Sequence, residues 1–127
     1  MEKFTKFARI AEIEFSDIIL STHLLDLKLR IYFKDKSYLD FFYTTHLRIQ
    51  RFSIHWERNH VDKTIYRLDN TPDTKWKRVQ TFPFHFHDGK YDKVKQTPFF
   101  IKDDFKLEEI FRDFLKFARK IIVPKNV

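Results

Sequence analysis

The stretch DLKLRIYFKDKSYLDFFYT, residues 26–44, decides the fold, because two alternating runs lie on either side of a short polar segment. Apolar residues occupy every second position of the first run: Leu27, Leu29, Ile31 and Phe33. Alternation with a period of two is typical of a strand that is buried on one face. The polar residues KDKS at 34–37 predict a turn, and YLDFFYT at 38–44 predicts the returning strand of a hairpin.

Strands are expected on both sides of this hairpin. The segments that favour an extended backbone are IILSTHLL (18–25), RFSIHWER (51–58), KTIYRLDN (63–70) and TFPFHFHDG (81–89). The polar residues NHVD at 59–62 predict a loop, and so does TPDTKWKR at 71–78, which contains Pro72. KVKQTPFFI at 93–101 favours an edge strand, because Pro98 limits ladder hydrogen bonding.

The two ends of the chain predict helices. Apolar residues at helical spacing favour a short amphipathic helix over residues 3–14. From Asp104 onward apolar residues recur every three or four positions, which predicts a longer helix capped by Asp103 or Asp104 and ending before Pro124. The expected fold class is therefore α+β: a mainly antiparallel sheet of about five strands, flanked by an N-terminal and a C-terminal helix that cover one face and leave the other open.

Length and composition bound the class of protein. A chain of 127 residues predicts one domain, 1–127. Hydrophobic residues make up 43% of the chain, and sixteen residues are phenylalanine, so the chain can supply a core. The absence of cysteine excludes disulfides and thiolate chemistry. A single glycine excludes the phosphate-binding loops of P-loop and Rossmann proteins, which need several. Few Asn and Gln, no Cys and 34% charged residues favour a thermophilic source.

The charge balance favours an anionic partner. Lys and Arg exceed Asp and Glu by seven, and the sequence pI is about 9.6, a balance typical of proteins that bind nucleic acid or an acidic protein. The N-terminal MEKFTKFARIAEIEF is too charged for a signal peptide, and no apolar run approaches the roughly 20 residues that span a bilayer. A cytoplasmic protein without a membrane partner is expected.

The string TFPFHFHDG suggests a functional site. On an extended backbone its alternate phenylalanines would anchor the strand in the core, while His85 and His87 share the polar face. Histidine titrates near neutrality, so two such groups can act as base and acid in the cleavage of RNA. A nearby cation must then stabilise the charged phosphorane, and Arg67 or Arg78 is a candidate.

Three alternatives remain open for the same residues. An H-x-H pair can bind a divalent metal if His55 or Asp69 completes the ligand set. Both histidines can be surface residues of an amphipathic strand, and Arg67 can simply pair with Asp69, two residues away on one strand face. Nucleic acid can also be bound without chemistry, by base stacking among basic side chains. That interface would consist of Tyr66, Lys75, Trp76, Lys77 and Arg78.

Three segments together resemble the hallmark blocks of the TumE family, small prokaryotic toxins of toxin–antitoxin pairs. RFSIHWER (51–58), IYRLDNTPD (65–73) and TFPFHFHDG (81–89) occur in the order and spacing of that family. Its pattern is approximately Y-S-[FY]-H-[WY], then [FY]-R-x-D-N-[AT]-P-H, then T-F-P-x-H-x-H, and FKDKSYLDFFY resembles its D-G-S-x-L hairpin. The likeness runs from about residue 24 to the final helix. The matching residues are His55, Arg67, Asp69, Asn70, Pro72, Phe82, Pro83, His85 and His87.

The sequence departs from this pattern at three positions. Asp73 stands where the family has histidine, Phe52 replaces a tyrosine, and Lys36 occupies the turn's glycine position. The change at 73 weakens the case for a metal site of three or four histidines, although aspartate also coordinates cations. It is also compatible with a member that has lost activity.

The resemblance implies a toxin whose partner is an acidic or DNA-binding antitoxin, and toxins of this kind commonly cut RNA. The implied site has His85 and His87 as acid and base, Arg67 stabilising the phosphate, Asp69 orienting an imidazole, and His55 beside them. The basic loop 75–78 would hold the RNA backbone. This chemistry needs no cofactor, with a divalent metal as the alternative, and a homo-oligomer is compatible with the sequence. The competing functions are a non-enzymatic module that binds nucleic acid or protein, and a metal-dependent hydrolase.

Overall fold

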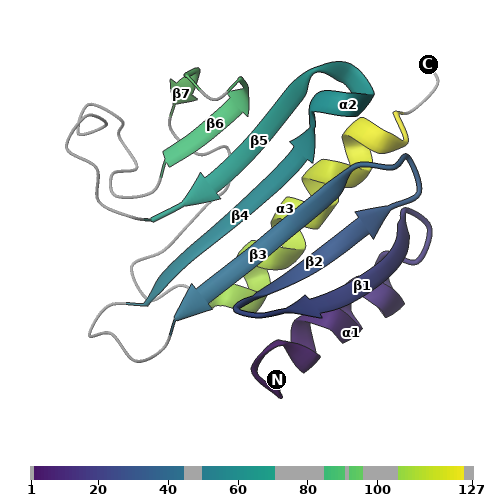
Figure 1. Ribbon diagram of the computed structural model, residues 1–127, viewed down its shortest axis with the longest axis vertical. Helices are drawn as coiled ribbons and strands as arrows, with labels where there is room; N and C mark the ends of the chain where they lie inside the picture. The colour runs from purple at the N-terminus through teal and green to yellow at the C-terminus, as the bar shows by residue number, and fades with distance from the viewer. Residues whose placement is uncertain (1, 45–49, 71–84, 91, 96–105, 125–127) are drawn as a thin grey trace.

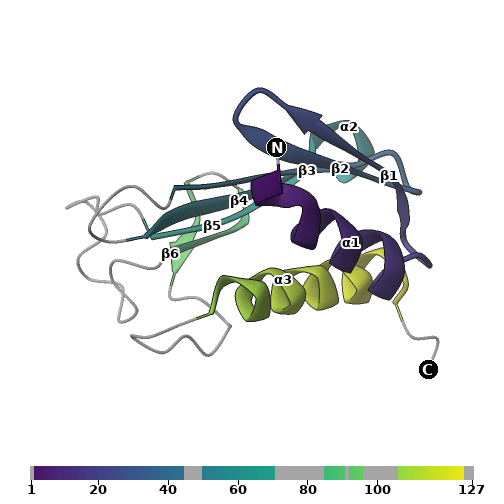
Figure 2. The same ribbon diagram turned by 90° about the horizontal axis from the view of Figure 1, so that it is seen from below.

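The protein is an antiparallel sheet with two helices on one of its faces (Figures 1 and 2). The computed structural model describes residues 2–44, 50–70, 85–90, 92–95 and 106–124. Every strand pairs with the next one along the chain, so the order in the sheet is β1-β2-β3-β4-β5-β6-β7. The strands are β1 (Ile19–Leu25), β2 (Lys28–Phe33), β3 (Tyr38–Thr44), β4 (Arg51–Arg58), β5 (Thr64–Asp69), β6 (His85–Gly89) and β7 (Val94–Lys95).

The helices come mainly from the two ends of the chain. A 3₁₀ turn, η1 (Glu2–Phe4), leads into α1 (Thr5–Glu14), and α3 (Leu107–Ile122) follows the sheet. Figure 2 shows α1 and α3 on the same side of the sheet. The face that these two helices do not cover is called the open face. A single helical turn, α2 (Asn59–Asp62), connects β4 to β5. None of the helices in the described part of the chain is long and apolar enough to cross a membrane.

The predicted α+β class with flanking helices is confirmed, and the sheet is larger than expected. The sheet has seven strands instead of about five, and the two edge strands, β1 (Ile19–Leu25) and the short β7 (Val94–Lys95), lie within segments that were expected to be extended. Leu27, expected in the core, is 72% exposed because it lies in the turn between β1 and β2. The residues NHVD form α2 rather than a loop.

The start of α3 also differs from the prediction. The helix begins at Leu107 with Lys106 at the N-cap position and no side-chain cap bond there. The predicted caps, Asp103 and Asp104, lie outside the described residues. The apolar positions of α3 that the periodicity predicts are buried from Leu107 to Ala118, whereas Ile121 and Ile122 are only partly buried.

Aromatic rings join the helices to the sheet. Three rings pack against one another in pairs, with centroids 4.8–5.2 Å apart: Phe7 of α1, Phe41 of β3 and Phe111 of α3. Further along α3, Phe117 packs edge-on against rings of β4, β5 and β6: Trp56, Tyr66 and Phe86. Such edge-to-face contacts add to the stabilisation from burial, so the phenylalanine-rich composition explains how one helix can hold three strands.

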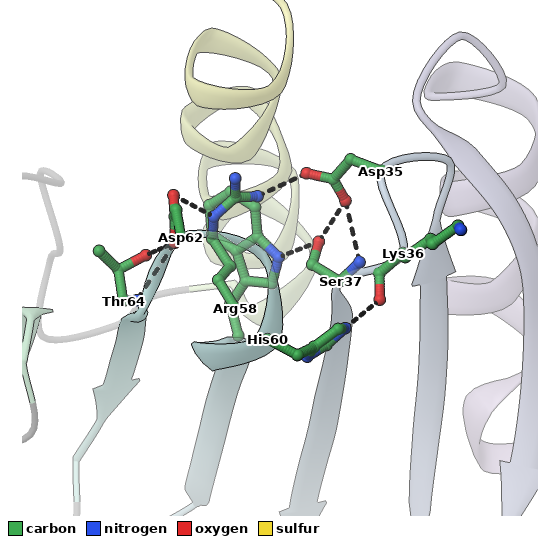
Figure 3. A network of polar contacts seen from close by, with 8 residues as sticks. Asp35, Lys36, Ser37, Arg58, His60, Asp62 and Thr64 are labelled. Atoms are coloured by element: carbon green, nitrogen blue, oxygen red, sulfur yellow. Dashed lines mark hydrogen bonds and ion pairs between the residues drawn. The ribbon is translucent and has the colours of Figure 1, made fainter.

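A polar network closes the end of the sheet where β2 turns into β3 (Figure 3). The buried guanidinium of Arg58 donates to Asp35 Oδ2 at 2.6 Å and to Asp62 Oδ2 at 3.1 Å, and it lies 4.6 Å from the Trp56 ring centroid. The Trp56 indole donates to Ser37 Oγ at 2.9 Å, and Ser37 in turn donates to Asp35. The network therefore ties the hairpin turn to the end of β4 and to α2.

Two residues of the turn between β2 and β3 have unusual surroundings. Lys36 has a φ of 75°, in the left-handed region that favours glycine. This is the position at which the TumE-like pattern has glycine, so the chain carries a strained residue there. Burial raises the pKa of the Asp35 carboxyl, but hydrogen bonds from Ser37 and Arg58 outweigh it and leave the pKa below its ordinary value.

Candidate functional site

The open face of the sheet brings several predicted site residues into one row. His55 of β4 is the register partner of Arg67 in β5, and Arg67 is the partner of His87 in β6. In the next row, Asp69 of β5 is the partner of His85 in β6. Directly opposed residues of an antiparallel pair have Cβ atoms about 4.5–5.5 Å apart, so the arginine lies between two histidine positions.

The row is held by polar contacts along the strands. Arg67 Nε donates to Asp69 Oδ2 at 3.0 Å, so a carboxylate fixes the guanidinium. His55 Nε2 lies 3.3 Å from Glu57 Oε1. The pairing of Arg67 with Asp69 was one of the alternatives raised by the sequence, and it is compatible with a functional site because a fixed guanidinium is also a better phosphate ligand.

Exposure to solvent differs between the members of this row. The side chains of His55 and Arg67 are 24% and 29% exposed. His87 is only 3% exposed, although it lies on the face that α1 and α3 do not cover. Asp69 is equally buried. His55 and Arg67 are therefore the accessible members of the row, and both Asp69 and His87 make further polar or ring contacts of their own.

Other predicted residues are not brought to this surface. Tyr66 lies on the helix side of β5, between Trp56 and Phe86, where burial raises the pKa of its phenol. The side chain of His85 and the residues Lys75, Trp76, Lys77, Arg78 and Asp73 lie outside the description. The same is true of Phe82, which was expected to anchor the histidine strand, whereas Phe86 is buried as predicted.

Asn70, also among the matching residues, has a structural contact. Its Oδ1 accepts from the backbone N–H of Phe52 at 2.9 Å, and its Nδ2 donates to the carbonyl of Gln50 at 2.7 Å. The amide thus continues the ladder between β4 and β5 by one more step, at a residue that is 1% exposed. Asn70 is therefore more than a turn residue.

Two charged groups near the row escaped the prediction. Glu57, which contacts His55, could have been found from the H-x-E spacing, since residues two apart share a strand face. Asp40 of β3, the register partner of His55, accepts from Arg30 Nε at 2.8 Å and from Lys28 Nζ at 2.9 Å. Burial raises the pKa of Asp40, but hydrogen bonds from these two cations outweigh it and leave the pKa below its ordinary value.

A metal centre has no ligand set in the part of the chain described. No three His, Cys, Asp or Glu side chains lie close enough there to hold an ion. His55 and Asp69, the residues considered as additional ligands, instead contact Glu57 and Arg67.

A family model described as toxin TumE matches residues 3–122. No curated protein and no solved structure matches the chain.

Proposed function

The chain belongs to the toxin TumE family, and on this premise we propose that its open sheet face cleaves RNA. The family is one of toxins and therefore implies an antitoxin as partner. The observation that supports RNA cleavage is the cross-strand row His55–Arg67–His87, in which a guanidinium stands between two imidazole positions. Neither a nucleotide-binding loop nor a cysteine nucleophile is available to this chain.

The chemistry follows from the order of the row. The 2′-hydroxyl of RNA attacks the adjacent phosphorus while a base takes its proton, and an acid gives a proton to the departing 5′ oxygen. Base and acid are needed on opposite sides of the phosphorus, and His55 and His87 flank Arg67 in this way. Arg67 binds the phosphate and stabilises the charge that develops on its oxygens.

Asp69 acts as a positioning residue in this mechanism. Its bond to Arg67 Nε leaves the terminal nitrogens of the guanidinium to face the phosphate. The sequence predicted that Asp69 would orient an imidazole instead, and the register partner of Asp69 is His85. His85 is kept as the alternative partner of His87 in acid–base transfer, and the experiment below separates it from His55.

The burial of His87 supports a second candidate, a non-enzymatic module that blocks growth by binding. In that case His87 and Asp69 hold the sheet together beneath a binding surface, and the basic loop 75–78 makes the contacts. Affinity would then fall steeply with salt, and substitutions at Lys75, Lys77 and Arg78 would outweigh any change of histidine.

Cleavage of end-labelled RNA by purified protein tests the proposal. The single variants His55→Ala, His85→Ala and His87→Asn are compared with the wild type, with and without a chelator. Loss of one acid or base is expected to slow cleavage about 10²- to 10⁴-fold for His87 and for one of the other two. Wild-type rates in all three variants would overturn the acid–base role, and cleavage that stops with chelator would instead indicate a metal-dependent hydrolase.

Growth of cells that express each variant supplies the matching test of toxicity. The proposal expects the variants that fail to cleave RNA to be non-toxic while their melting temperatures stay close to that of the wild type. Non-cleaving variants that still arrest growth would favour the binding module.

A further inference from the structure

A second row of rings crosses the open face beside the candidate site. The rings come from four different elements: His23 of β1, Tyr32 of β2, Tyr38 of β3 and His60 of α2. Neighbouring ring centroids are 5.4 Å apart for His23 and Tyr32, 6.1 Å for Tyr32 and Tyr38, and 6.3 Å for Tyr38 and His60. The row therefore runs continuously across the strands rather than along one of them.

These rings are not part of the hydrophobic core. The core lies on the helix side, and in β2 and β3 it takes the alternate residues Leu29, Ile31 and Phe33, then Leu39 and Phe41. The two histidines are exposed and the two tyrosines are half-buried. Such rings can contact a ligand through the faces and edges that their neighbours leave accessible.

Positive charge accompanies the rings. The guanidinium carbon of Arg30 lies 4.2 Å from the centroid of Tyr38, and Arg30 and Lys28 share the single carboxylate of Asp40. These three side chains carry one net positive charge, and Glu57, the register partner of Tyr38, adds a second carboxylate beside the rings. Rings beside cations suit a ligand that combines flat bases with phosphates.

The ring row is continuous with the candidate site. Arg30 is the register partner of Asp40, Asp40 of His55, and His55 of Arg67. From Arg30, an RNA strand that follows this line of residues reaches Arg67, the proposed phosphate ligand, after three strand spacings, about 14 Å.

We propose that His23, Tyr32, Tyr38 and His60 form a platform on which bases of single-stranded RNA stack, and that it delivers the strand to the row His55–Arg67–His87. This inference rests on the proposed action on RNA and adds that the RNA substrate is single-stranded. Ring faces accept any base, so binding tolerates sequence. Duplex RNA is excluded because its bases are already stacked and hidden.

The competing explanation is that the rings only stabilise the sheet as cross-strand pairs, since Tyr32 and Tyr38 are register partners. The two explanations differ for substitutions that remove the ring but keep an apolar side chain. Tyr→Leu removes the stacking face, whereas Tyr→Phe keeps it and loses only the hydroxyl. The platform requires Leu to weaken RNA binding and Phe to preserve it.

Fluorescence anisotropy with a short labelled 2′-O-methyl RNA of mixed sequence tests the platform. Such RNA lacks the attacking hydroxyl, so binding is measured without cleavage. Tyr32→Leu and Tyr38→Leu should each raise Kd about 5- to 150-fold, the range for loss of one stacked base, while Tyr32→Phe and Tyr38→Phe bind as the wild type does. Lys120→Ala, which removes one positive charge from α3 on the other face, is the control and should leave Kd unchanged.

Three results would overturn the platform. They are Leu variants that bind as tightly as the wild type, a wild-type protein that binds the matching duplex as tightly as the single strand, and a wild-type protein that binds neither. Failure of the proposed catalysis looks different, because histidine variants would then cleave normally while the tyrosine variants still lose affinity. Melting temperatures of the Leu and Phe variants show whether a loss of binding comes from unfolding.

Discussion

Removal of the Arg58 guanidinium tests how the hairpin turn is held to the sheet. The side chain of Arg58 is 6% exposed, and those of its partners Asp35 and Asp62 are 22% and 40% exposed. The variant Arg58→Ala deletes both ion pairs and the contact with the Trp56 ring. It leaves two carboxylates without their cation at the same end of the molecule.

The size of the effect follows from these exposures. Hydrogen bonds to charged groups contribute about 1.5–3 kcal/mol each. Removing one partner of a buried pair costs about 3–5 kcal/mol, but Asp35 and Asp62 can regain water, which reduces the cost. We expect Arg58→Ala to lower the free energy of unfolding by about 2–4 kcal/mol, or the melting temperature by about 8–15 °C, since about 4 °C corresponds to 1 kcal/mol in a domain of this size.

Urea unfolding followed by circular dichroism measures this loss. Arg58→Lys keeps the charge but not the forked geometry and should lose about 1–2 kcal/mol. Arg51→Ala, an arginine at the other end of β4, is the control and should stay within about 0.5 kcal/mol of the wild type. A free energy of unfolding for Arg58→Ala within about 1 kcal/mol of the wild type would refute the reasoning.

Three further predictions concern stability. Lys36→Gly should raise the free energy of unfolding by about 0.5–1 kcal/mol, because a φ of 75° costs a side-chain-bearing residue more than glycine loses in flexibility; a thermal melt that shows no gain would contradict this. Asn70→Asp should cost about 2–3 kcal/mol by urea unfolding, since the carboxylate cannot donate to the backbone carbonyl that the amide contacts, and a neutral outcome would deny the ladder-like role of the amide. The pKa values of Asp35, Asp40 and Asp62 lie below the ordinary value of 3.8. The contribution of these carboxylates to stability is therefore fully present above pH 3.8, and it is lost as the pH falls through their lower pKa values in the folded protein. Unfolding curves between pH 7 and pH 2 should show this loss, and Asp40→Asn should reduce it.

The strands could be predicted where one face alone is buried. β3 and β4 match their predicted bounds, because Leu39 and Phe41 or Phe52 and Ile54 alternate with polar residues. β1 lacks the regular alternation of β2, and its pairing with β2 contains a shift in register between Ile19 and Ser21. The edge strand expected over residues 93–101 is present as β7 at Val94–Lys95, and residues 96–101 lie outside the described residues.

For the candidate site, the sequence predicts only the face of the sheet on which each residue lies. His55, Arg67 and His87 lie on one face because each occupies the polar phase of its strand, whereas Tyr66 is in the opposite phase and faces α3. The pairing between strands also requires the register, which no single segment contains. For the same reason the contact of Arg58 with a turn residue 23 positions earlier could not be foreseen.

Burial of the polar row was beyond the sequence as well. The period-two pattern predicts which face His87 occupies, and the structure shows that it is 3% exposed on that face. The TumE-like sequence pattern predicted instead that His87 is exposed to a substrate. The structure shifts the accessible part of the candidate site to His55 and Arg67.

The single-turnover rate of RNA cleavage by Arg67→Ala tests the central claim most directly. Arg67 is central to the proposed row and partly exposed, so its removal should affect chemistry more than folding. We expect the rate to fall about 10²- to 10³-fold while Arg51→Ala cleaves at the wild-type rate. An Arg67→Ala protein that is folded and cleaves RNA as fast as the wild type would contradict the account.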